Sequence, residues 1–119
     1  MALLEIVNPT KEPTRYYSSK QEKSIAKKLN GKQQVNSGAT KFKKGDVELD
    51  SWLLECKTKM TKSDSISIKK DWLEKTEKEA LFMGKPYSAL VINFGPDTKN
   101  YVVIDENVFK ELLDSLKEN

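Results

Sequence analysis

Residues 45–57 contain two short runs of alternating apolar and polar side chains, separated by an Asp-Ser pair at 50–51. Successive side chains of a β-strand point to opposite faces of the sheet. If the Asp-Ser pair forms a two-residue turn, Leu49 pairs with Trp52, and the other pairs follow from this one. The apolar residues of both runs then share one face, which is what normally fixes strand register. The pattern therefore predicts a β-hairpin with one apolar and one charged face.

The charged face of this hairpin brings two carboxylates together. In the predicted register Asp46 lies opposite Glu55, and Lys57 shares a face with Glu55. Like charges placed opposite each other destabilise a sheet, so a compensating positive charge is expected nearby. A divalent cation held by oxygen ligands would supply it, beside the Lys57 ammonium. A solvated charged surface explains the same spacing, and the hairpin alone does not distinguish the two.

The chain has no histidine and a single cysteine. It therefore cannot use serine–histidine or cysteine–histidine catalysis, or zinc bound by histidine. An enzyme of this composition has to work with carboxylates, lysines, hydroxyls or a metal held by oxygen. Cys56 belongs to the apolar face of the hairpin, which predicts a packing role. One cysteine cannot form an internal disulfide, which favours a reducing, cytoplasmic setting.

The charges are distributed unevenly along the chain. Residues 20–70 carry thirteen lysines and six acidic residues, whereas residues 71–119 carry six lysines and ten acidic residues. A basic first half predicts a face that binds a polyanion, with a lysine-rich solubilising surface as the alternative. No apolar run is long enough to cross a bilayer, and residues 1–7 lack the basic segment of a signal peptide. We therefore expect no membrane partner.

The 119 residues are enough for one domain. Two prolines and no periodicity in residues 8–15 predict an extended N-terminal arm over residues 1–15, followed by a single domain over residues 16–119. The arm could exchange between subunits or wrap DNA, or its apolar residues Leu3, Leu4, Ile6 and Val7 could add an edge strand, and the sequence leaves these possibilities open. The expected elements are a helix over 19–30, strands over 33–37, 46–50 and 52–59, a helix over 67–83, strands over 87–94 and 101–104, and a last helix capped by Asp105.

This order predicts an α/β fold in which helices cover both faces of a mixed sheet. The strand, helix, strand succession from residue 52 to residue 94 predicts a parallel crossover. The expected core includes the apolar stripe of the last helix: Val108, Phe109, Leu112, Leu113 and Leu116.

Glu22 has two interpretations in the first predicted helix. Ser19 and Glu22 fit a capping box, in which the glutamate folds back onto its own helix. Glu22 also lies one turn before Ile25, in a stripe completed by Ala26 and Leu29. In that position its carboxylate would face the sheet, where it needs a partner such as a metal.

The combination resembles the PD-(D/E)xK nuclease superfamily over about residues 19–94. Gly45-Asp46 stands at the place of that family's Pro-Asp, and Glu55-Cys56-Lys57 matches its Glu-x-Lys. Within the superfamily the chain is most similar to archaeal-type Holliday junction resolvases and related phage endonucleases. Those proteins have a first-helix glutamate, matched by Glu22, and a Ser-Gly segment, matched by Ser37 and Gly38. The resemblance implies a restriction-endonuclease-like core of αβββαββα order and a phage or prokaryotic origin.

The resemblance also implies a set of site residues. Asp46 and Glu55 would bind Mg²⁺, which Mn²⁺ could replace, with the Cys56 carbonyl and Glu22 as further ligands. Lys57 would orient the attacking water, help to deprotonate it, or neutralise developing charge. The sequence does not distinguish these roles. Asp46, Glu55, Lys57 and Glu22 are thus the expected catalytic residues. The residues expected to bind nucleic acid are Ser37, Lys41, Lys43, Lys44, Lys59 and Lys62, although Ser37 fits a plain turn equally well.

The expected function is a metal-dependent endonuclease that cuts DNA, in the first place branched DNA such as four-way junctions, as a homodimer. A restriction, nicking or single-strand nuclease would use the same residues. A non-catalytic DNA-binding module on the same fold and a lysine-rich assembly protein are the alternatives from other classes.

Overall fold

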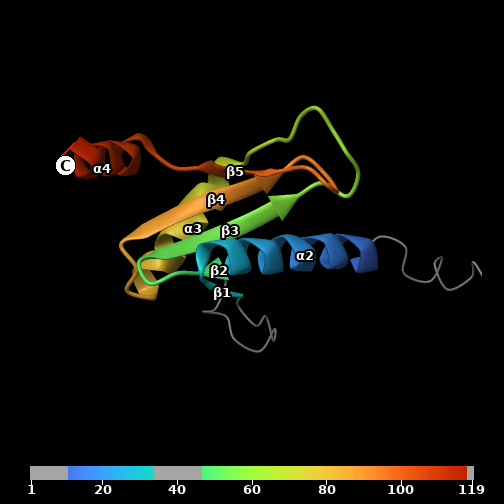
Figure 1. The fold of residues 1–119 in the computed structure, drawn as a ribbon, viewed down its shortest axis with the longest axis horizontal. Helices are drawn as coiled ribbons and strands as arrows, with labels where there is room; N and C mark the ends of the chain where they lie inside the picture. Colours follow the sequence, from blue (N-terminus) through green and yellow to red (C-terminus); the bar gives the residue numbers. More distant parts are fainter. Residues whose placement is uncertain (1–10, 34–46, 118–119) are drawn as a thin grey trace, which may run out of the picture.

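A computed structural model describes residues 11–33 and 47–117, with side chains from residue 19 onward. It is an α/β structure in which a five-stranded mixed sheet of order β1-β2-β3-β4-β5 is flanked by helices (Figure 1). The elements are α2 (Lys11–Leu29), β1 (Lys32–Gln33), β2 (Val47–Glu48), β3 (Trp52–Thr58), α3 (Lys70–Phe82), β4 (Tyr87–Asn93), β5 (Asn100–Val103) and α4 (Glu106–Lys117). Within the described residues, the succession of helices and strands agrees with the prediction. None of the described helices has the length and apolar composition needed to span a bilayer.

The hairpin register follows the predicted pairing. Val47 pairs with Leu54 and Glu48 with Leu53 in antiparallel fashion, and the Leu49 amide donates to the Trp52 carbonyl at 2.9 Å. The predicted Asp-Ser turn is therefore confirmed. Asp46, the expected partner of Glu55, lies outside the described residues.

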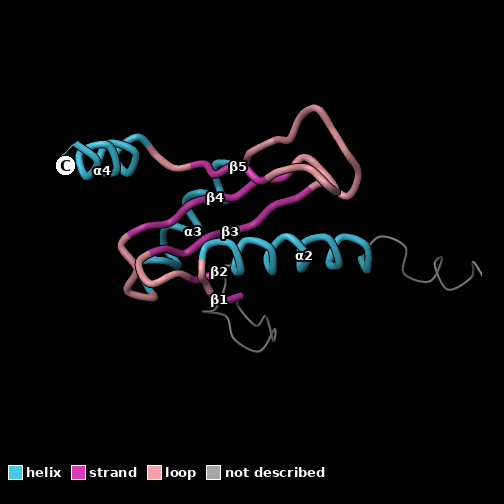
Figure 2. Tube along the Cα trace, viewed as in Figure 1, coloured by secondary structure: helices cyan, strands magenta, loops and turns pink. Residues whose placement is uncertain are grey.

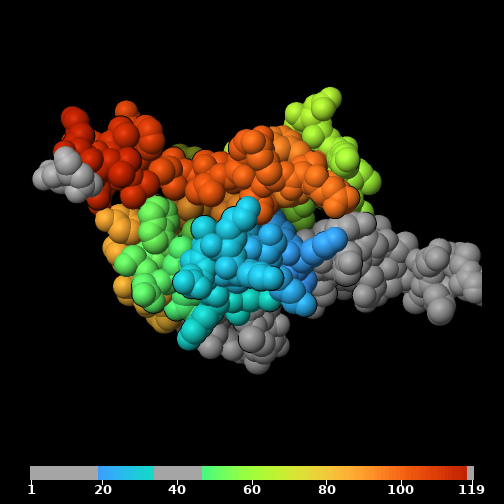
Figure 3. All heavy atoms as spheres, viewed as in Figure 1, coloured from blue at the N-terminus to red at the C-terminus, as the bar shows by residue number. Residues whose placement is uncertain are grey.

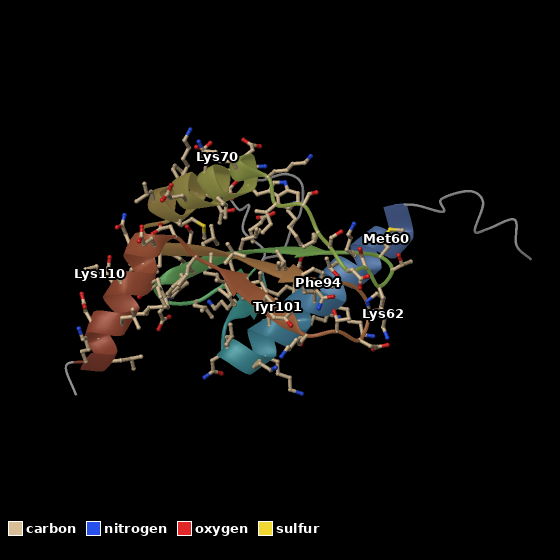
Figure 4. The ribbon with its side chains drawn as sticks, turned by 90° about the horizontal axis from the view of Figure 1, so that it is seen from above. Met60, Lys62, Lys70, Phe94, Tyr101 and Lys110 are labelled. Carbon is tan, nitrogen blue, oxygen red and sulfur yellow. The ribbon has the colours of Figure 1, made fainter. Side chains whose placement is uncertain are left out.

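The two main helices cover opposite faces of the sheet, as Figures 2 and 4 show. On the α2 face, one apolar cluster joins the helix to three strands through Ile25, Val47, Leu54, Cys56, Ala89 and Val91. The buried Cys56 thiol belongs to this cluster, as predicted. Strand alternation directs Leu53 to the α3 face, where it is fully buried. The α2 side is the one seen in the space-filling view (Figure 3).

Helix α2 begins earlier than the sequence suggested. It starts at Lys11, so residues 11–15 of the expected extended arm are helical. Pro13 is compatible with this start, because the first turn of a helix does not need its backbone N–H groups for intrahelical bonds. Ser19 consequently lies inside the helix, and the predicted capping box is wrong. Leu29, expected in the buried stripe, is 44% exposed, whereas Gln21 is buried.

The remaining helix and strand boundaries differ from the expected ones by a few residues. β1 covers only the start of the strand expected over 33–37, whose other residues lie outside the described part. α3 starts at Lys70 rather than at residue 67, which leaves Ile68 exposed. It ends at the predicted glycine, because Gly84 adopts a left-handed φ of 76°.

The parallel crossover from β3 through α3 to β4 is confirmed by the pairing of Trp52 with Tyr87 and of Thr58 with Asn93. Beyond β4, Gly95 packs against the loop that precedes α3. A Cβ atom on Gly95 would lie 2.5 Å from the Lys62 Cα atom, so only glycine fits. The Ser63 amide also donates to the Phe94 carbonyl at 2.8 Å. The loop before α3 is thus held against the end of β4.

Helix α4 corrects a prediction about the core. Asp105 caps the helix as expected, accepting from the Val108 amide at 2.9 Å. However, its apolar stripe is not buried: Phe109, Leu112, Leu113 and Leu116 are all exposed. The reason is the order of the sheet, because α2 and α3 already cover its two faces and α4 follows the edge strand β5. The helix extends away from the sheet (Figure 1).

A hydrogen bond from the Tyr87 hydroxyl to Glu111 Oε1, 2.7 Å long, ties α4 to the start of β4. This bond and the negative charge of Glu111 raise the pKa of Tyr87 above its usual value of 10.0. The neutral phenol is favoured in the folded protein, so the contact is present below pH 10 and is lost as pH rises through the raised value.

We therefore expect Glu111→Gln to lower the pKa of one tyrosine toward 10. The measurement is a tyrosinate absorbance titration compared with the unmodified protein. Glu106→Gln, on the same helix, serves as the control and should leave the curve unchanged. Superimposable curves for all three proteins would show that Tyr87 does not contact Glu111 in solution.

Candidate functional site

Glu55 and Lys57 form an ion pair on the charged face of β3. The Lys57 Nζ atom lies 3.4 Å from Glu55 Oε2, and the lysine and glutamate side chains are 31% and 21% exposed, respectively. The alternation of the strand puts both on the α3 face, opposite Cys56. A carboxylate and an ammonium that are held by a central strand yet open to solvent can act on a bound ligand.

Trp72 of α3 forms one wall of this site. The Lys57 Nζ atom lies 4.6 Å from the centroid of the Trp72 ring, and the Lys69 Nζ atom lies 5.9 Å from it. Both distances fit cation–π contacts. The sequence predicted Trp72 only as part of the apolar stripe of a helix. Its contact with Lys57 could not be predicted, because the two residues belong to different elements. Trp72 therefore joins two ammonium groups in one positively charged patch.

The first turn of α3 adds backbone donors to this patch. Lys69 occupies the N-cap position and makes no side-chain capping hydrogen bond. The first backbone N–H groups of a helix have no intrahelical partner and carry a partial positive charge. Lys70 follows directly, paired at 3.7 Å with the exposed Glu74. Figure 4 shows Lys70 at the start of α3. Backbone donors and lysines together favour an anion such as phosphate, although the Asp71 carboxylate in the same turn opposes it.

Glu22 has a different partner from the one expected of a metal ligand. Its carboxylate Oε1 accepts a hydrogen bond of 3.0 Å from Gln33 Nε2 on β1. Helix α2 packs against the Cys56 face of the sheet, whereas Glu55 points to the other face. Among residues 19–33 and 47–117, no three acidic or cysteine side chains form a group that could hold a metal. The metal prediction therefore depends on Asp46.

Gln21 is a buried residue that the sequence analysis missed. Its Nε2 atom lies 3.2 Å from the Lys57 carbonyl, 3.4 Å from the Val91 carbonyl and 3.2 Å from Asn100 Oδ1. The position of Gln21 one turn before Ile25 was a signal that could have found it. The side chain supports the backbone of Lys57 from the α2 face and so helps to fix the strand that carries the ion pair.

Two of the expected DNA-binding lysines follow β3. Lys59 is half-buried and its amide donates to the Asn93 carbonyl at 3.2 Å. Lys62 is exposed in the next loop (Figure 4). Both lie between the ion pair and the start of α3 in the chain. The remaining predicted residues lie outside the described part: Ser37, Lys41, Lys43, Lys44 and Asp46.

Comparison of the chain with family models, curated proteins and solved structures gives no match.

Proposed function

We propose that this chain is a metal-dependent endonuclease that hydrolyses phosphodiester bonds in DNA. The observation that carries the proposal is the partly exposed Glu55–Lys57 pair on β3, next to the lysines at the start of α3. The paired acidic and basic residues supply reactive groups, and the positive patch supplies a place for a phosphate. We further propose that the sheet and its helices form a restriction-endonuclease-like core.

Asp46 is the second carboxylate of the proposal. The pairs Val47–Leu54 and Glu48–Leu53 set a register that, continued by one residue, would place Asp46 opposite Glu55. Glu55 is open to solvent and Lys57 is its ion-pair partner. Two carboxylates with one lysine suit Mg²⁺, which binds to few protein oxygens and keeps several waters. In this arrangement Asp46, Glu55 and the Cys56 carbonyl would hold the ion, and Glu22 stays a secondary prediction.

Each residue of the site then has a separate task. The metal, when bound, would activate water and neutralise charge on the scissile phosphate. The Lys57 ammonium, held between Glu55 and the Trp72 ring, is placed to hold the attacking water or to donate to a phosphate oxygen. Lys69 and the first turn of α3 would bind a phosphate without reading the bases.

The proposal is tested by a cleavage panel with Mg²⁺ or Mn²⁺ on a four-way junction, a flap, nicked and linear duplexes, and single-stranded DNA. We expect cleavage, with the branched substrates cut fastest, and no cleavage in EDTA. Isothermal calorimetry with Mn²⁺ should detect metal binding that is lost in Asp46→Ala. DNA binding without cleavage or metal uptake would show instead a DNA-binding module.

The positive patch makes its own prediction. Combined Lys69→Ala and Lys70→Ala substitutions should weaken DNA binding about fivefold to twentyfold at moderate salt and lower the salt slope by about one per lysine. The measurement is fluorescence anisotropy over a salt series. Lys78→Ala, an exposed lysine further along α3, is the control and should change little. An equal loss of affinity per removed lysine in the double variant and in Lys78→Ala would mean that DNA responds only to overall charge.

A further inference from the structure

The apolar stripe of α4 is the largest group of exposed apolar side chains on one described element. Phe109, Leu112, Leu113 and Leu116 are 53%, 41%, 44% and 71% exposed. They recur at spacings of three and four residues, so they lie on one side of the helix. None of the extensive contacts between described helices and strands involves α4. A contiguous apolar surface of this kind normally marks an interface.

The charges beside the stripe indicate what covers it. Glu106 and Lys117 are about three helical turns apart, so they lie on the same flank of the stripe at opposite ends. Against an antiparallel copy of the same helix, Glu106 of each chain would face Lys117 of the other. The acidic first turn and basic last turn also match the opposed helix dipoles of an antiparallel pair. The surface is thus complementary to itself.

The face of α4 away from the stripe contacts its own chain. Glu111, which lies about 150° around the helix from the centre of the stripe, accepts a hydrogen bond of 2.7 Å from Tyr87. A membrane surface fits less well, because helix α4 carries three acidic residues and two lysines, whereas helices that lie on membranes are rich in basic residues.

We propose that α4 is a dimerisation helix that packs antiparallel against α4 of a second copy through Phe109, Leu112, Leu113 and Leu116. Such pairing is isologous, since the same surface is used on both chains, and it closes after two copies. The inference rests on α4 alone and holds whether or not the chain cuts DNA.

Sedimentation velocity of the full chain across a concentration series tests the proposal. We expect the unmodified protein to sediment as a dimer. Leu113→Glu should raise the dissociation constant of the dimer at least about a hundredfold, because the interface would then bury two glutamates. Leu29→Glu on α2 is a matched control, because both leucines are 44% exposed. It should remain dimeric, and circular dichroism should show that both variants are folded.

A charge exchange tests the antiparallel arrangement. Lys117→Glu should weaken the dimer about tenfold, because both attractive contacts become repulsive, and adding Glu106→Lys should restore it. Failure of the double variant to recover would overturn the antiparallel packing. A monomeric unmodified protein, or a dimeric Leu113→Glu variant, would overturn the interface itself. Loss of the dimer in Leu4→Glu would mean that the N-terminal segment, rather than a second α4, covers the stripe. That result would also overturn the proposal.

Discussion

Replacing Glu55 or Lys57 by alanine is expected to lower the rate of DNA cleavage by about a hundredfold to a thousandfold at saturating Mg²⁺. Glu55→Ala removes a proposed metal ligand, and Lys57→Ala removes the ammonium that lies 3.4 Å from it. Asp46→Ala should have an effect of the same size. The measurement is single-turnover cleavage of the best substrate from the panel.

The paired control is Lys110→Ala on α4, which breaks an ion pair of 2.8 Å that is far more exposed than the Glu55–Lys57 pair. Its cleavage rate should stay within about twofold of the unmodified rate, because exposed pairs contribute little. DNA affinity in calcium, measured in parallel, should fall much less than the rate in the three site variants. Full activity of Glu55→Ala, Lys57→Ala and Asp46→Ala together would exclude the proposed mechanism.

Asn93→Ala is expected to destabilise the fold by about 3 kcal/mol or more. The Asn93 amide is buried at the end of β4 and joins the strand to the following turn. Its Nδ2 atom donates to the Thr98 carbonyl and to Asn100 Oδ1, both at 3.0 Å. Alanine would remove this donor from the half-buried Thr98 carbonyl and leave Asn100 Oδ1 with Gln21 Nε2 alone, and polar groups that lose partners inside the fold are costly.

The Oδ1 atom of Asn93 is equally engaged. It accepts from the Gly95 amide at 2.9 Å and from the hydroxyls of Thr98 and Thr58 at 3.1 and 3.2 Å. Thermal unfolding followed by circular dichroism should show a Tm about 10 °C or more lower for the variant. The exposed Asn107→Ala is the control and should shift stability by no more than about 0.5 kcal/mol. Similar Tm values for both variants would mean that the turn does not depend on Asn93.

The sequence predicted the central elements well where one period governed the pattern. The hairpin register was correct because alternation puts Val47 and Leu54 on the same side, and the two-residue turn then selects one pairing. β4 was recognised because its apolar run has no polar face, as expected of a strand covered on both sides.

The sequence was less informative wherever the answer depended on contacts between distant elements. The apolar stripe of α4 predicted that this side of the helix is buried. It did not show that α2 and α3 already cover both faces of the sheet. Gln21 and Glu22 are neighbours on α2, and a helical period alone did not decide which of them faces the sheet. The contact of Lys57 with Trp72 joins two elements across the fold, so no local pattern could reveal it.

The start of α2 was misplaced for a different reason. Two prolines in residues 8–15 suggest extended chain, yet Pro13 falls in the first helical turn, where a missing N–H is harmless. Half of the proposed metal pair, Asp46, lies outside the described residues. The proposed site therefore combines one described residue pair, Glu55 and Lys57, with one residue inferred from the strand register.

The close approach of Gly95 to Lys62 has a consequence for how a ligand is received. The loop that leads to α3 is fixed to the end of β4, and Lys57 on β3 contacts Trp72 on α3. These contacts connect the two sides of the site and oppose movement of one side relative to the other. If DNA binds there as proposed, the DNA has to deform to fit the protein, so substrates that bend easily at a branch or nick would be favoured over stiff duplex.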